Sequence, residues 1–302
     1  MRALVPHSFL PQAPPQGGAP APASFVHLLK GHSGAQVTLH TKGRTSLVRK
    51  TAGTVDQNDR LMRQSAHQRK LSACGLRFPR ILREGQNEHG HAFFEMEYIP
   101  ARSLAAILCE AAPFDAPQTI KALEQALGFF RITAGADHPE QVFHAKLDQI
   151  GAAAPRAAVI IARLRAMDWR GIPCSLSHGD MTLENILHCP SRGVVFIDCD
   201  DGFAPSWWLD AAKLCQDALG HWCMRDMYLN APGGAGWLNA RQRLDRMAVA
   251  VGGIAARLEP LLAARLPQLT ALHLLRTLPY TRDEKLTGFV LDRSAHILDT
   301  AS

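Results

Sequence analysis

The chain has 302 residues, of which 47% are hydrophobic and 20% are charged, a balance typical of a globular protein with a sizeable core. The formal net charge is +6 and the isoelectric point is about 9.1. The basic residues are scattered and no nucleic-acid-binding motif accompanies them, so we expect no nucleic-acid partner. No apolar run reaches the length of a membrane span and no signal peptide is recognisable, so we expect no membrane partner. Seven cysteines without a CxxC pair are typical of free thiols in a reducing compartment, which predicts a cytoplasmic protein.

The first 24 residues are dominated by proline, glycine and alanine and predict a disordered tail. Residues 25–98 have the texture of a small β-rich domain. Residues 99–302 are mainly helical in texture. The sequence therefore predicts an α+β protein with a tail and two parts.

The β-rich part contains a glycine turn followed by a hairpin. Gly31, Ser33 and Gly34 form the turn, whose backbone N–H groups could approach phosphates. An ordinary glycine hairpin is the alternative interpretation. The segment 36–40 alternates as a strand does, and residues 45–50 form the returning strand after a turn. Strand alternation places Arg49 and Lys50 on opposite faces of the sheet, so only one of them points inward.

A helix and a final strand complete the β-rich part. The pattern from Asn58 to Ser72 predicts a helix, with Asn58 as its N-cap. The final strand of the β-rich part, residues 92–97, is apolar. It runs into the sequence Met96-Glu97-Tyr98-Ile99-Pro100, where proline ends the strand.

The helical part contains long alanine-rich segments with apolar stripes at helical spacing. Residues 143–167 and 248–266 each predict helix. These stripes are interpreted as core faces.

The most informative stretch runs from residue 176 to residue 210. His178, Gly179 and Asp180 are followed five residues later by Asn185. The apolar run 194–197 then predicts a buried strand that ends at Asp198. Carboxylates at the end of a buried strand need a partner or a metal ion, and hard oxygen ligands of this kind suit Mg²⁺ held together with a substrate phosphate.

This spacing resembles the catalytic core of the aminoglycoside phosphotransferases and their protein-kinase-like relatives. The resemblance implies a two-lobed protein-kinase-like fold, with residues 25–98 as the β-rich N-lobe and residues 99–302 as the mainly helical C-lobe. It implies transfer of the γ-phosphoryl group of ATP or GTP to a small-molecule hydroxyl, with Mg²⁺.

The resemblance also implies a role for each motif residue. Asp180 would be the catalytic base, and Asn185 and Asp198 would hold Mg²⁺. His178 would brace the loop, and Asp210 would support it through backbone hydrogen bonds.

For the nucleotide, the resemblance implies that Lys50 binds the phosphates, with Arg49 as the alternative. Ser33 and Gly34 would lie in the nucleotide-covering loop, and the backbone of Glu97 and Ile99 would face the adenine edge.

The chain departs from the family pattern in the helix of residues 58–72, which contains no glutamate to pair with the lysine. Gln64 and Gln68 stand in that region. A catalytically silent nucleotide-binding or scaffold protein is therefore one alternative. A metal-dependent phosphohydrolase that uses His178, Asp180, His188, Asp198 and Asp200 is a second.

The acceptor is only weakly indicated. From Asp217 onward there are eight acidic and ten basic residues. This balance does not indicate an acceptor pocket lined with carboxylates for a polycationic substrate. A neutral or anionic alcohol, such as a sugar or a sugar derivative, fits better. Trp207 and Trp208 could stack on a sugar ring or belong to the core. The sequence does not predict an oligomeric state.

Overall fold

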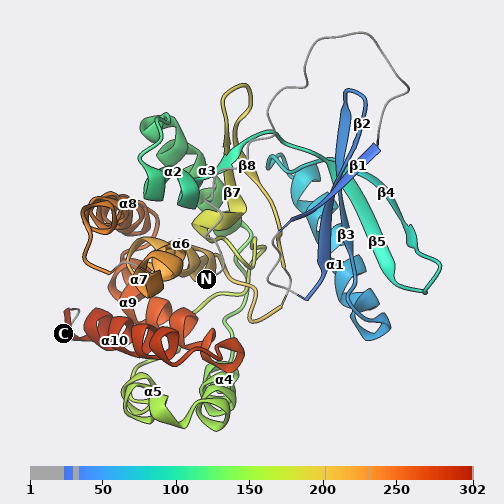
Figure 1. Cartoon of the computed structure of the whole chain (residues 1–302). Helices are drawn as coiled ribbons and strands as arrows, with labels where there is room; N and C mark the ends of the chain where they lie inside the picture. The colour runs from blue at the N-terminus through green and yellow to red at the C-terminus, as the bar shows by residue number, and fades with distance from the viewer. Residues whose placement is uncertain (1–23, 30–33, 201, 231, 301–302) are drawn as a thin grey trace. The chain divides into compact units, whose positions relative to one another are not determined.

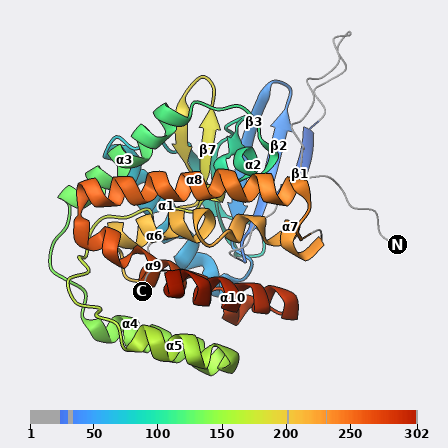
Figure 2. The same ribbon diagram turned by 90° about the vertical axis from the view of Figure 1, so that its left-hand side faces the viewer.

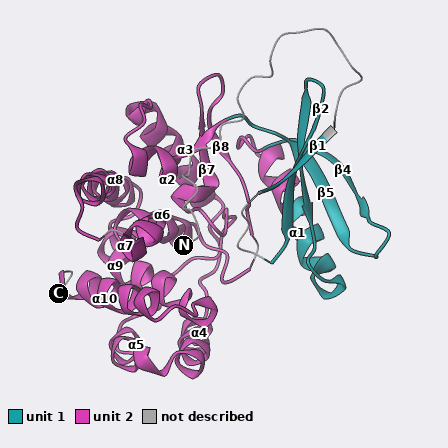
Figure 3. Cartoon of the chain, viewed as in Figure 1, with its two compact units in different colours: residues 1–65, 79–100 teal, residues 66–78, 101–302 magenta. Residues whose placement is uncertain are grey.

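The computed structural model describes residues 24–29, 34–200, 202–230 and 232–300. The chain divides into two compact units, which Figure 3 shows in two colours. Unit 1 comprises Met1–Ser65 and Pro79–Pro100, and unit 2 comprises Ala66–Phe78 and Ala101–Ser302. Residues 1–23 of the predicted disordered tail lie outside the described residues. Gly31 and Ser33 of the predicted glycine turn also lie outside them.

Unit 1 is built on an antiparallel sheet with the strand order β1-β2-β3-β5-β4 (Figure 1). The strands are β1 (Ser24–Leu29), β2 (Gln36–Lys42), β3 (Thr45–Thr51), β4 (Ile81–Gln86) and β5 (Ala92–Glu97). A short 3-10 turn, η1 (Val55–Gln57), leads into helix α1 (Asn58–Ala73).

The core of unit 1 joins the first half of α1 to the sheet. Ala52, Leu61, Ala92 and Phe94 form one buried apolar cluster. The amide of Asn58 ties the start of the helix to the same sheet, because its Nδ2 donates to the Gly90 oxygen at 2.8 Å and its Oδ1 accepts from the Ala92 N–H at 2.7 Å. The prediction of Asn58 as an N-cap was therefore wrong: the side chain serves the turn before β5 instead of the helix N–H groups.

Unit 2 is mainly helical (Figure 1). It also contains a small sheet in the order β6-β7-β8. The strands are β6 (Arg102–Ser103), β7 (Ile186–Cys189) and β8 (Gly193–Phe196). The α-helices after α1 are α2 (Leu104–Glu110), α3 (Ala116–Ile132), α4 (Glu140–Ala153), α5 (Ala158–Arg165), α6 (Trp207–Ala218), α7 (Arg225–Asn230), α8 (Ala235–Leu258), α9 (Pro260–Leu275) and α10 (Glu284–Thr300). The 3-10 turns are η2 (Pro155–Ala157), η3 (Leu183–Asn185), η4 (Trp222–Met224) and η5 (Leu278–Tyr280).

Helix α6 lies at the centre of unit 2. It runs along α8 and α9, and α10 packs on α9 (Figure 2). Ser206 caps its start, since the serine oxygen accepts from the Trp208 N–H at 3.3 Å. Every residue of α6 is buried except Lys213. Trp207 and Trp208 are 2% and 3% exposed, so both belong to the core and neither is available to stack on a sugar.

Two predicted helices are interrupted by proline. The segment 143–167 divides into α4 and α5 at Pro155, and the segment 248–266 divides where α8 ends and α9 begins at Pro260. Proline lacks the N–H that would continue the helical ladder, but its fixed φ suits the first turn of a new helix. Among the described residues, none of the helices combines the length and the hydropathy that crossing a bilayer requires.

Candidate functional site

The loop of residues 178–185, called the HGD loop below, is held by a buried carboxylate. The Asp210 Oδ2 accepts the His178 N–H at 2.6 Å, and its Oδ1 accepts the Gly179 N–H at 2.8 Å. Burial raises the pKa of Asp210 to about 7, although these two N–H groups and Lys213 act in the opposite direction. Asp210 therefore satisfies two donors at the start of the loop, as the sequence predicts for a supporting residue.

Gly179 lets the HGD loop approach the segment that follows β8. Its φ is +82°, and a Cβ at this position would lie 1.7 Å from the Asp200 carbonyl oxygen. The Asp200 N–H in turn donates to the His178 oxygen at 2.9 Å. Glycine is required here for both backbone conformation and space, and the close approach brings the HGD loop and residues 198–200 together.

His178 is fully buried and acts as a brace within unit 2. Its ring stacks on Phe78, with centroids 5.7 Å apart and planes 20° apart, and also contacts Phe196. Burial lowers the pKa of His178 to about 4, so the ring is neutral at physiological pH. The ring Nδ1 accepts from the Asp180 N–H at 3.3 Å, which links the brace to the next motif residue.

Asp180 is fixed by two different donors, one on each carboxylate oxygen. The Asn185 Nδ2 donates to Asp180 Oδ2 and to the Asp180 backbone oxygen, at 2.9 Å each. The Lys213 Nζ lies 3.0 Å from Asp180 Oδ1. Burial raises the pKa of Asp180, but Lys213, His178 and Arg276 together outweigh it and leave the pKa below its ordinary value. The carboxylate is therefore ionised and oriented.

Asn185 and Asp198 are brought together by the β7–β8 hairpin. Ile186 pairs with Phe196, and the Ile197 N–H donates to the Asn185 oxygen at 2.9 Å. Asp198 has a φ of +57°, a left-handed conformation that is costly for a residue with a side chain. Strained backbone of this kind is concentrated at functional sites.

These two residues fit a magnesium ion. The Asn185 amide donates through Nδ2 toward Asp180, so its Oδ1 lies on the other side of the amide group. An amide oxygen and a carboxylate are the hard ligands that Mg²⁺ accepts, with substrate phosphate oxygens and water completing its coordination. Among the described residues, no group of three or more His, Cys, Asp or Glu side chains could hold a metal by itself. His188, one of the ligands that the phosphohydrolase alternative requires, packs its ring edge-on against Phe114.

In unit 1, the structure distinguishes Lys50 from Arg49. Lys50 is 4% exposed and its Nζ donates to Gln64 Oε1 at 3.0 Å. Arg49 lies on the opposite face, where its Nε donates to Glu95 Oε1 at 3.0 Å and its guanidinium covers the Phe93 ring. The inward cation of β3 is therefore Lys50. Gln64 supplies an oxygen at the place where the family pattern expects a glutamate, and Gln68 lies one turn further along α1.

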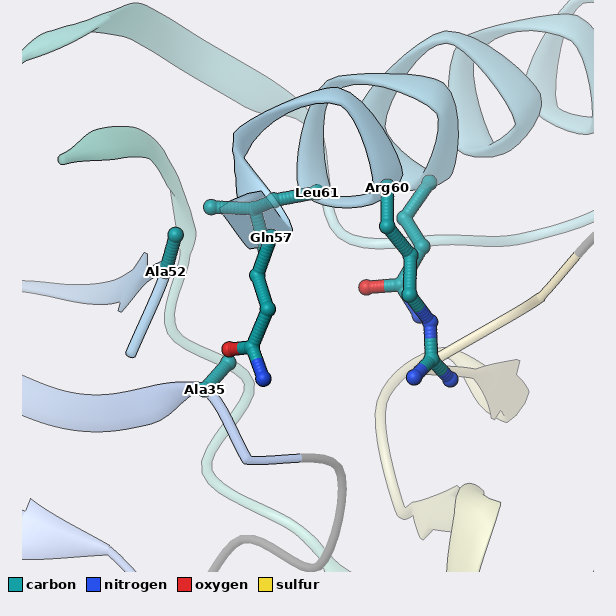
Figure 4. Close-up of a pocket in the computed structure, with 6 residues that line it drawn as sticks. Ala35, Ala52, Gln57, Arg60 and Leu61 are labelled. Carbon is teal, nitrogen blue, oxygen red and sulfur yellow. The ribbon is translucent and has the colours of Figure 1, made fainter. Parts of the chain in front are cut away.

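Gly34 lies beside a recess in unit 1, which Figure 4 shows in close-up. Its φ is +78°. A Cβ on Gly53 would lie 2.3 Å from the Gly34 oxygen, so the two backbones are in close contact. Gln57 accepts from the Gly53 N–H at 3.1 Å and its amide is directed toward Ala35. The recess is lined by Ala35, Ala52, Gln57, Arg60, Leu61 and Gln64.

The segment predicted to face adenine closes unit 1. Strand β5 ends at Glu97, whose N–H donates to the Arg80 oxygen at 3.0 Å. Ile99 is 5% exposed, and unit 1 ends at Pro100. Both residues stand at the exit of the sheet, and their proposed backbone role stays a prediction.

The sequence pattern of the phosphotransferase enzyme family, abbreviated APH, matches residues 25–246. The chain belongs to this family. Its match spans both units and includes every predicted site residue. A search of curated protein sequences returned no match for this family member.

Solved structures show the same fold. A thermostable mutant of aminoglycoside phosphotransferase APH(4)-Ia in its apo form has a TM-score of 0.58 at 13% identity, covering 92% of this chain and 95% of that one. A putative fructosamine-3-kinase from Haemophilus somnus 129PT has a TM-score of 0.53 at 12% identity, covering 91% and 92%. The type VIII aminoglycoside-3'-phosphotransferase has a TM-score of 0.50 at 16% identity, covering 91% and 94%. The predicted protein-kinase-like fold, with a β-rich N-terminal part and a mainly helical C-terminal part, is confirmed.

Two residues of α6 contact the HGD loop without having been predicted from the sequence. Lys213 pairs with Asp180, and Asp217 Oδ2 accepts the Leu183 N–H at 2.7 Å. With Asp210 they occupy positions i, i+3 and i+7, which lie on one face of a helix. Because Asp210 was already predicted to support the loop, the spacing of Lys213 and Asp217 from it could have predicted their contacts with the loop.

Proposed function

We propose that the protein transfers the γ-phosphoryl group of ATP or GTP to a hydroxyl group of a small molecule, with Mg²⁺. The observation that carries this proposal is the arrangement of Asp180, Asn185 and Asp198 around one loop that buried Asp210 anchors. Family membership supports phosphoryl transfer as the chemistry. Complexes of aminoglycoside phosphotransferase APH(4)-Ia mutants with ADP and with AMP-PNP are among the solved neighbours, and they support a nucleotide as the donor.

In this proposal Asp180 orients the acceptor hydroxyl. The acceptor oxygen forms a bond to the γ-phosphorus, while the bond from that phosphorus to the β–γ bridging oxygen breaks and the nucleoside diphosphate leaves. The acceptor proton passes to Asp180 and then to solvent. Because Asn185 and Lys213 each hold one oxygen of this carboxylate, its orientation is fixed before the acceptor binds.

The remaining site residues would bind the donor. Asn185 and Asp198 would hold Mg²⁺, which when bound neutralises phosphate charge during transfer. Lys50 would bind a phosphate group, and Gln64 would orient its ammonium without neutralising it. The glycine loop at Gly34, with Ser33, would cover the phosphates, and the backbone of Glu97 and Ile99 would contact the adenine.

Turnover with a panel of alcohols tests the proposal. Release of nucleoside diphosphate that depends on an added alcohol and on Mg²⁺ is the expected result. Asp180→Asn keeps the shape of the side chain and removes its basicity, so it should reduce this rate by about 100-fold or more. A fully active Asp180→Asn variant would overturn the assignment of Asp180.

A catalytically silent nucleotide-binding protein is the second candidate, and the observation that favours it is Gln64 in place of a glutamate. It would be supported if nucleotide bound with Mg²⁺ but no alcohol raised the release of diphosphate above background hydrolysis.

A further inference from the structure

Three cations of unit 2 lie close to Asp180 or to the Phe203 ring. Lys213 pairs with Asp180 directly. The Arg276 guanidinium lies over the Phe203 ring, 4.6 Å from its centroid, and the Lys146 Nζ lies 5.1 Å from the same centroid. The positive charge of Arg276 helps to lower the pKa of Asp180. These cations come from α4, α6 and the end of α9, so the fold brings them together from distant parts of the sequence.

Two of these cations have no anionic partner among the described residues. Arg276 donates through Nη1 to the His273 Nδ1 at 3.0 Å, and Lys146 donates to the Gln149 amide oxygen at 2.7 Å. Both partners are neutral: arginine has only donors, so the His273 Nδ1 must be the acceptor, and burial places the pKa of that ring well below its ordinary value. Asp180 and Asp200 are near enough to act on the charge of Arg276, but neither forms an ion pair with it in the described part of the chain.

The two unpaired cations also repel each other. Burial lowers the pKa of Lys146, and the nearby Arg276 lowers it further. Like charges held together at a partly buried place are costly unless an anion joins them. The Arg276 guanidinium lies against the Phe203 ring, and only its Nη1 donates to another side chain in the described part of the chain. Its other N–H groups can therefore donate to an anion.

We propose that the acceptor is a small hydroxylated anion, with a carboxylate or phosphate bound by Arg276 and Lys146 and a hydroxyl directed to Asp180. This inference rests on the proposed phosphotransferase function and narrows its acceptor class. It makes Arg276 and Lys146 specificity-determining residues. The neutral sugars that the sequence also allowed would lack the group that these cations recognise.

Matched pairs of probes test the inference. The protein is first saturated with Mg²⁺ and the non-hydrolysable donor AMP-PNP, and its melting temperature is then followed during titration with a second molecule. Glucuronate is compared with glucose, and glycerol 3-phosphate with glycerol, so that the carboxylate and the phosphate are tested separately. The anionic member of at least one pair should half-saturate at a concentration about tenfold lower than the neutral member.

Charge-matched variants distinguish the site from a general attraction to a basic protein. Arg276→Gln and Lys146→Gln should each remove the preference for the anion. Arg131→Gln and Lys121→Gln, which remove the same charges from exposed positions, should keep it. Arg276→Lys retains the charge and serves if Arg276→Gln does not fold; it should keep part of the preference.

An equal response to both members of each pair, including no response to either, would overturn the inference. A preference for the anion that persists in both Arg276→Gln and Lys146→Gln would also overturn it. Failure of the proposed function is a separate result. It would appear as the absence of any Mg²⁺-dependent shift with AMP-PNP, or as nucleotide binding without any alcohol-dependent release of nucleoside diphosphate.

Discussion

The Lys213 ammonium lies 3.0 Å from the Asp180 carboxylate, and it comes from the one residue of helix α6 that is not buried. The pair gives the proposed base a permanent positive neighbour. It explains why the pKa of Asp180 is below its ordinary value although burial acts in the opposite direction. Lys213 is therefore a positioning residue that sets both the orientation and the ionisation of Asp180.

Replacing Lys213 with methionine should change the pH dependence of turnover. Asp180 accepts a proton only when it is ionised, so activity is lost as the pH falls through its pKa. Without the ammonium that pKa rises, and the acidic limb of the kcat/KM profile moves to higher pH. Lys213→Arg keeps the charge and should leave the limb near its wild-type position. A Lys213→Met profile with an unchanged acidic limb would show that the pair does not control Asp180.

Gly179→Ala should destabilise the protein and abolish turnover. The added methyl group would overlap the Asp200 carbonyl, and the left-handed φ adds further strain. We expect a loss of at least about 2 kcal/mol in the free energy of unfolding, measured with urea. Gly171 is a matched control, because its φ is +75° and nothing lies within 4 Å of the added Cβ. A comparable loss in Gly171→Ala would mean that φ alone, and not the contact with Asp200, explains the effect.

Asp217→Asn should alter the pH dependence of stability. Burial, with the nearby charge of Glu184, raises the pKa of Asp217 from 3.8 to about 7 in the folded protein. The stability that this raised pKa contributes is complete below pH 3.8 and is lost as the pH rises toward 7. Asparagine accepts from the Leu183 N–H but does not titrate in this range. Urea unfolding between pH 4 and 8 should therefore show a shallower decline in the variant, and parallel curves would contradict this role.

Gln64→Ala should weaken nucleotide binding. It removes the oxygen that accepts from the buried Lys50 ammonium, and a lost hydrogen bond to a charged group is worth about 1.5–3 kcal/mol. Binding of ATP with Mg²⁺, measured by calorimetry, should fall roughly tenfold or more. Gln64→Glu retains an acceptor and should bind at least as well as Gln64→Ala. Equal affinity for ATP in the wild type and in Gln64→Ala would show that Gln64 does not contribute to nucleotide binding.

The protein-kinase-like fold could be predicted because the spacing of His178, Asp180, Asn185 and Asp198 resembles that of a known family. The β-rich and helical parts could be predicted because strand alternation and helical periodicity are local patterns. Strand alternation correctly placed Lys50 and Arg49 on opposite faces. The apolar run 194–197 predicted the strand before Asp198, but the hairpin of β7 and β8 that joins it to Asn185 was not predicted. The hydrogen bond from Lys50 to Gln64 could not be predicted, because Gln64 and Gln68 lie on one helix face and the sequence does not show how α1 packs on the sheet.

The cationic side of the site could not be predicted for a different reason. Arg276 and Lys146 are 130 residues apart in the sequence, and only the folded chain brings both to the Phe203 ring. A count of acidic and basic residues indicates the balance of charge, but it does not reveal which charges lack partners. The helix interruptions at Pro155 and Pro260 were missed because apolar periodicity continues across them, although proline itself is a local signal.

The central claim is that this chain binds a nucleotide through a metal held by Asp198. The most direct test is a thermal-shift titration with ATP and GTP, each with and without Mg²⁺, on wild type and on Asp198→Ala. The account predicts a rise in melting temperature that requires Mg²⁺ and is lost in Asp198→Ala, since ligand that binds only the folded state stabilises it. A folded wild-type protein that shows no shift with either nucleotide, or an Asp198→Ala variant with the full shift, would contradict the claim.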